Sequence, residues 1–88
     1  MPYIRKEKRP EVDKILDPLI VYLKSKPMEE QDGIVNYVVS KMIWSLYPKK
    51  YFHLNRALGV LTAITHELYR RIVAPFEDEM IKERGDIK

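Results

Sequence analysis

The sequence contains no cysteine, and this absence excludes two common ways of stabilising a short chain. Disulfides cannot form, and the two histidines, His53 and His66, cannot complete the Cys/His ligand set of a structural zinc site. A chain of 88 residues suffices for one domain, but it buries only about 60 to 65% of its unfolded surface. We therefore expect association with further copies, in a homo-oligomer of two subunits or more.

Long apolar runs are also missing, which excludes a membrane-spanning helix of about 18 residues or more. The first ten residues, MPYIRKEKRP, lack the apolar segment of a secretory signal, so a cytoplasmic location is expected. Hydrophobic residues make up 45% and charged residues 33% of the chain, as is typical of globular proteins. Glutamine and asparagine are scarce while lysine, glutamate and isoleucine are frequent, a balance also seen in proteins from thermophilic organisms.

Helical periodicity is the main signal that the sequence does contain. Apolar residues recur at the i, i+3, i+4 and i+7 spacing of a buried helical face in several segments. Pro18 falls inside the first segment and predicts either a kink or a later helix start. The predicted helices cover residues 10–23, 33–46, 51 or 54 to 74, and 75–85. This pattern predicts an all-α fold, a three-to-four-helix bundle in which residues 1–88 form a single helical domain.

The formal net charge is only +3, but the charges are unevenly distributed. Residues 1–9 form a basic N-terminal arm, and residues 75–88, the short fourth helix and the tail, are mainly acidic. The arm favours weak binding to phosphates, and the alternative function that it predicts is association with nucleic acid. The residues expected to make these contacts are Arg5, Lys6, Lys8 and Arg9.

Aromatic residues mark a second face of the helix predicted over 33–46. Tyr37, Trp44 and Tyr47 project away from the centre of its apolar arc, so two faces of this helix require burial. Aromatic residues are enriched at the anchors of protein interfaces, and these three are therefore the predicted homodimer interface. The alternative is that the fourth helix or the N-terminal arm covers these rings within one subunit.

Polar side chains line one side of the third predicted helix, where they surround a glycine. Gly59 in a helix interior costs about 1 kcal/mol relative to alanine, which predicts close approach of another helix or, less simply, of a small ligand. A solvated helix face produces the same polar pattern, and a lone histidine specifies no reaction. The residues of this polar stripe are Asn55, Gly59, Thr62, His66 and Arg70. No catalytic residue and no cofactor is predicted.

Paired carboxylates raise a third alternative, a magnesium-dependent all-α nucleotide pyrophosphatase-like enzyme. Such enzymes use Glu-x-x-Glu followed by Glu-x-x-Asp, and the sequence has no such pattern. Most of these acids fall at helix starts, where they complement the helix dipole, so no metal site is predicted. The acids concerned are Asp13, Asp17, Glu29, Glu30, Asp32, Glu77 and Asp78.

Three segments carry a recognisable pattern: EEQDGIVNYVV at 29–39, NRALGVL at 55–61 and ELYRRIVAPFEDE at 67–79. They resemble a small family of uncharacterised helical proteins from microbes and their viruses. The resemblance implies a compact helical unit and transfers no catalytic residue. The function expected from the side chains is that of a small binding or assembly module without catalysis.

Overall fold

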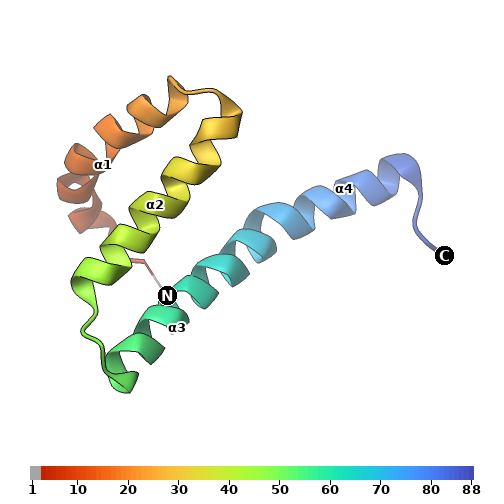
Figure 1. Cartoon of the computed structure of the whole chain (residues 1–88). Coiled ribbons are helices and arrows are strands. Elements are labelled where there is room, and N and C mark those ends of the chain that lie inside the picture. The colour runs from red at the N-terminus through yellow and green to blue at the C-terminus, as the bar shows by residue number, and fades with distance from the viewer. Residues whose placement is uncertain (1–2) are drawn as a thin grey trace. The chain divides into compact units, whose positions relative to one another are not determined.

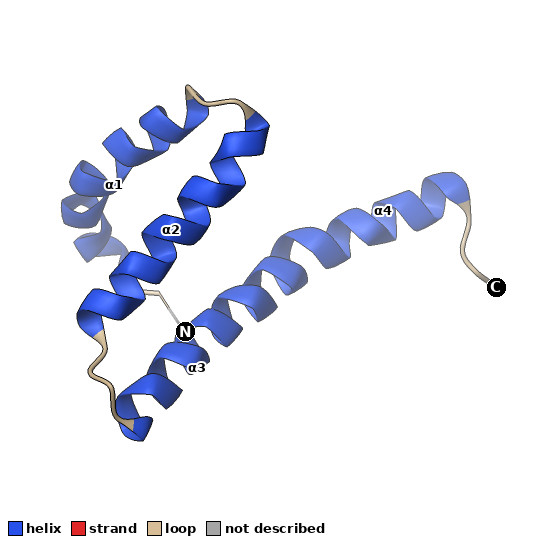
Figure 2. Cartoon of the chain, in the orientation of Figure 1, coloured by secondary structure: helices blue, strands red, loops and turns tan. Residues whose placement is uncertain are grey.

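The structure, a computed structural model, describes residues 3–88, and every regular element in this part of the chain is helical (Figures 1 and 2). The predicted all-α class is therefore confirmed. The chain divides into two units at Lys49 and Lys50, and each unit is described by itself. Within the described residues, no helix is both long enough and apolar enough to cross a membrane.

The first unit is a helical hairpin. A 3-10 turn at Lys6–Lys8 leads into α1 (Arg9–Lys24), and α2 (Met28–Leu46) runs back beside it (Figure 1). Pro10 lies in the first turn of α1, where its missing N–H costs nothing. Pro18 lies well inside α1 and the helix continues through it, so the later start offered as one possibility is wrong.

The connection between α1 and α2 is shorter than the sequence predicts. We expected the second helix to begin at Gly33, but it begins at Met28, directly after Pro27, which acts as its N-cap residue. Glu29 and Glu30 then fall in the first helical turn, where carboxylates stabilise the positive end of the helix dipole. The side-chain amide of Gln31 donates hydrogen bonds to the carbonyls of Leu23, at 3.1 Å, and Lys26, at 3.2 Å, which fixes the turn.

The second unit is one long helical rod (Figure 2). It consists of α3 (Tyr51–Leu68), a π turn at Tyr69–Val73, and α4 (Ala74–Arg84). The widened turn precedes Pro75, whose ring clashes with the carbonyl four residues earlier in a regular α-helix. Gly85 ends the rod in the left-handed region, at φ 93°, as predicted for the stop of the fourth helix.

Neither unit encloses a hydrophobic core. Ala57, 4% exposed, is the one fully buried side chain of residues 3–88, and most large apolar side chains are exposed. The predicted three-to-four-helix bundle is therefore wrong for either unit alone, because two helices share only one seam and a single rod has none. The organisation of 1–88 as one domain stays a prediction.

Candidate functional site

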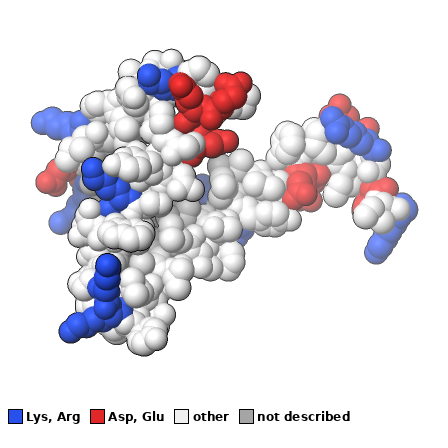
Figure 3. All heavy atoms as spheres, in the orientation of Figure 1, with Lys and Arg blue, Asp and Glu red and all other residues white. Residues whose placement is uncertain are grey.

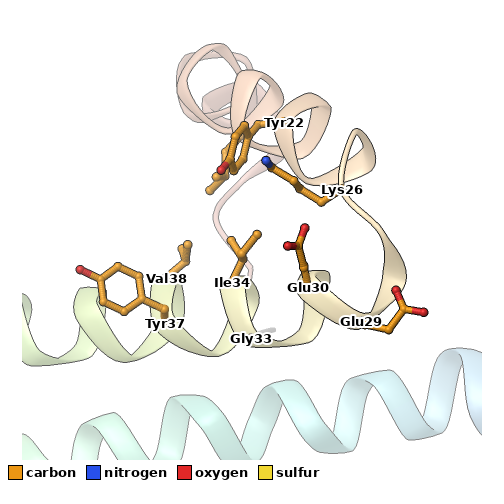
Figure 4. Close-up of a pocket in the computed structure, with 9 residues that line it drawn as sticks. Tyr22, Lys26, Glu29, Glu30, Gly33, Ile34, Tyr37 and Val38 are labelled. Atoms are coloured by element: carbon orange, nitrogen blue, oxygen red, sulfur yellow. The ribbon is translucent and has the colours of Figure 1, made fainter.

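An open groove lies along the seam of the helical hairpin, where side chains of α1 and α2 meet. Ile34 and Val38 point from α2 toward Tyr22 of α1 (Figure 4). Both α2 side chains are half-buried, as are Leu19 and Leu23 on the facing side of α1. The two amphipathic stripes predicted for these helices therefore meet, but each covers only one side of the other.

An open groove of about 640 Å³ follows this seam. Its walls are mainly apolar, and charged side chains stand at the end next to the turn (Figure 4). The ammonium group of Lys26 lies 5.1 Å from the ring centroid of Tyr22, and that of Lys41 lies 5.6 Å from the ring centroid of Tyr37, both within cation–π range. The lining residues are Leu19, Tyr22, Lys26, Glu29, Glu30, Gly33, Ile34, Tyr37 and Val38.

Two of the three aromatic residues predicted for the interface lie open to solvent. Tyr37 is 62% exposed at the rim of the groove, and Trp44, two turns further along α2, is 77% exposed. Tyr47 is half-buried and follows the last residue of α2 with extended backbone angles. Because the helix has ended there, extrapolated helical geometry does not place its ring. Tyr37 and Trp44, seven residues apart on α2, therefore share a surface, and helical spacing does not extend that surface to Tyr47.

Sequence reasoning missed the contribution of the first helix to this groove. Tyr22 lies seven residues after Ile15, and both are exposed on the same edge of α1. That spacing was a usable signal, since it marks a second apolar edge beside the main arc. Glu29 and Glu30 were considered only as paired carboxylates and dipole caps, and they were not connected with a groove because the second helix was expected to begin at Gly33.

The polar stripe of α3 is an exposed helix face. All five predicted residues, from Asn55 to Arg70, are exposed and follow one side of the rod. A Cβ added at Gly59 would meet no atom of the rod within 4 Å beyond the backbone of its own helix, so residues 50–88 do not by themselves make the close approach expected there. Arg70 donates to the Glu67 carboxylate at 2.8 Å, an exposed i, i+3 pair that contributes at most about 1 kcal/mol.

The basic arm is partly engaged in local structure. Arg9 is the first residue of α1; its Nε donates to the Ile4 carbonyl at 3.1 Å, and its guanidinium lies 5.9 Å from the centroid of the Tyr3 ring. Arg5, Lys6 and Lys8 are exposed on or beside the 3-10 turn. The first two residues of the predicted arm, 1–2, lie outside the described residues.

One ionisable side chain on the second unit has a shifted pKa. A hydrogen bond with the Glu77 carboxylate and the negative charge of that group raise the pKa of the Tyr69 hydroxyl above its usual value. This contact joins the π turn to the first turn of α4. It is a structural contact on an exposed surface, and it provides neither a nucleophile nor a general base at neutral pH.

Acidic side chains gather at one place in the first unit without forming a ligand set. Figure 3 shows acidic atoms over the start of α2, and basic atoms beside the segment that follows its end. Within residues 3–88 there is no group of three or more His, Cys, Asp or Glu residues that could hold a metal ion.

The sequence comparisons agree with the resemblance seen in the three segments. The model of a family described as a domain of unknown function, DUF6899, matches residues 1–87. No curated protein and no solved structure matches the chain. The expected membership in an uncharacterised helical family is thereby confirmed, and no residue receives a role from a relative.

Proposed function

The chain belongs to the family of the DUF6899 domain of unknown function, and we propose from its structure that it is a small helical assembly module without catalysis. Copies of the chain associate with one another through the exposed aromatic side of the hairpin. The anchors of this contact are Tyr37 and Trp44, with Tyr47 at its edge.

The exposure of Trp44 is the observation that carries this proposal. Trp44 is 77% exposed, on a helix whose opposite side is also apolar. Burying a large apolar side chain contributes about 1.5 to 3 kcal/mol, whereas a soluble chain gains nothing from leaving such a ring in water. Tyr37 lies on the same side of α2 and adds a second ring with a polar hydroxyl, a combination common at interface anchors.

The distribution of apolar residues around α2 supports a second copy as the partner. Ile34 faces α1, Val35 lies on a second side, and Trp44 lies on a third. One neighbouring helix covers one side of α2. Even if another helix of the same chain covered a second side, a third would remain, and an identical chain offers the matching apolar surface.

Native mass spectrometry of the intact chain tests this proposal. Trp44→Ala is expected to lower the oligomeric mass at micromolar protein, because it removes the largest exposed ring from the contact. Tyr51→Ala, at the first residue of α3, is the matched control, since Tyr51 is also a highly exposed aromatic residue but lies on the other unit. An unchanged mass for Trp44→Ala, or a monomeric parent protein, would contradict the proposal.

A second candidate function rests on the exposed cations of the arm. Arg5, Lys6 and Lys8 lie exposed within one turn, and the ion pair described in the structure involves none of them. Their charged groups are therefore placed to contact phosphates. Fluorescence anisotropy with labelled RNA and DNA tests this candidate. Salt-sensitive binding that is lost when the three residues become alanine would support it, and binding that survives their removal would refute it.

A further inference from the structure

A second apolar surface runs along α2 on a side that faces neither α1 nor the aromatic rim. Met28 and Leu46, at its two ends, are 74% and 70% exposed, and Val35 and Met42 between them are also exposed. The aromatic contact proposed above does not involve these residues. They therefore form a separate apolar surface, and the contact through Tyr37 and Trp44 does not account for its exposure.

The spacing of this surface is that of a coiled-coil seam. Met28, Val35 and Met42 recur every seven residues, and a second series follows four residues behind each of them. The two series together occupy the a and d positions of successive heptads, the pattern by which two helices pack knobs into holes. The complete seam is Met28, Asp32, Val35, Val39, Met42 and Leu46.

The charges at the ends of α2 favour one orientation for a partner of identical sequence. Glu29 and Glu30 lie in the first turn, and Lys49 and Lys50 follow the end of the helix (Figure 3). Two parallel copies would bring acidic ends together, whereas two antiparallel copies bring each acidic start to the basic end of the other. Antiparallel packing also aligns the opposite helix dipoles favourably.

We propose that the Met28–Leu46 seam of α2 pairs with the same seam of a second copy, antiparallel and across a twofold axis. In this register Met28 packs against Leu46 of the second copy, and Val35 packs against Val39 of the second copy. The inference rests on the proposed self-assembly and adds a contact on another side of α2. Two isologous contacts on different sides of one helix join the chain into assemblies larger than a dimer.

Disulfide trapping tests the seam, because the chain has no cysteine of its own. The Met28→Cys and Leu46→Cys proteins are mixed in equal amounts and oxidised mildly, and the masses of the disulfide-linked products are measured by mass spectrometry. The two positions lie about 27 Å apart along one helix, at 1.5 Å per residue, so only one orientation brings each mutant together with the other. Ile87→Cys, at a fully exposed site near the end of the chain, measures random collision.

The main product expected is the disulfide that joins Met28→Cys to Leu46→Cys, well above the yield of the Ile87→Cys control. The same product is expected in a Trp44→Ala background, because the two contacts are separate. Disulfides between identical mutants would overturn the antiparallel arrangement. Yields no higher than those of the control would overturn the seam. In that case, an oligomeric mass that still depends on Trp44 would leave the proposed function standing. A monomeric mass would contradict both the seam and the proposed function.

Discussion

The hairpin and the long rod use the same kind of helix but are held in different ways. In the hairpin, side chains from two helices meet across a seam, and Gln31 ties the end of α1 to the start of α2. Along the rod, the side-chain interactions described link residues within about two turns of the same helix, as in the pairs of Arg70 with Glu67 and Tyr69 with Glu77. The hairpin is thus specified by its own contacts, while the rod depends more on whatever covers its apolar residues.

Matched isoleucines give the largest expected difference between the two regions. Ile34 is half-buried in the hairpin seam, and Ile72 is exposed in the π turn. Ile34→Ala is expected to lower the free energy of unfolding by about 2 kcal/mol, and Ile72→Ala by less than about 0.5 kcal/mol. Chemical denaturation at one fixed protein concentration measures both. A loss at Ile72 equal to that at Ile34 would show that the rod is buried as deeply as the hairpin.

The two internal prolines sharpen the comparison, because each region accommodates its proline differently. Pro18 removes a backbone hydrogen bond inside the regular helix α1, whereas a π turn precedes Pro75. Pro18→Ala is expected to raise the free energy of unfolding by about 1.5 kcal/mol, because the missing hydrogen bond is restored.

Pro75→Ala is expected to gain less than about 1 kcal/mol, since the widened turn has already relieved the clash. The thermal midpoints of both variants, measured at equal concentration, give the ranking. A larger gain at Pro75 than at Pro18 would mean that the π turn is a strained segment.

Gln31 provides a smaller and more local test of the hairpin. Gln31→Ala removes both hydrogen bonds to the turn carbonyls and is expected to cost about 1 kcal/mol, because a hydrogen bond contributes about 0.5 to 1.5 kcal/mol net of the bonds that the same groups make to water in the unfolded chain. Asn36→Ala is the control, since its side chain accepts only an exposed bond from Ser40. Equal losses for the two variants in urea unfolding would contradict the role of Gln31 in fixing the turn.

The Tyr69 and Glu77 pair gives the smallest expected effect, in the rod. The pKa of Tyr69 is raised in the folded chain, so the pair stabilises the fold below the usual tyrosine pKa, near 10, and the contribution is lost as the pH rises through the raised value. In the ultraviolet titration of tyrosine, Tyr69→Phe should remove a late-ionising component. Glu77→Gln should move that component to lower pH, and a titration identical to the parent in both variants would contradict the contact.

Periodicity allowed the helices and their stops to be predicted, while the surfaces between them were largely beyond it. Gly85 was identified as the end of the last helix because glycine is the residue that most readily adopts the positive φ at which many helices end. The early start of α2 was missed because an Asp-Gly pair, here Asp32-Gly33, resembles a turn. In the structure the backbone N–H groups of Glu30 and Gln31 already donate to the Pro27 carbonyl, so the helix has begun before that pair. The exposure of Val35 and Met42 was also missed. Apolar periodicity indicates which side of a helix favours burial, but it does not identify the neighbouring element that covers that side.

The π turn also sets a rule for insertions and deletions. The bond from the Ala74 N–H to the Tyr69 carbonyl spans five residues where an α-helix spans four, so the turn holds one residue more than a regular helix needs. Deleting one residue from 69–73 would leave the helix beyond it in its present phase, but it would restore the clash at Pro75. A shortened chain should therefore be tolerated only together with Pro75→Ala, which makes the two changes a compensating pair.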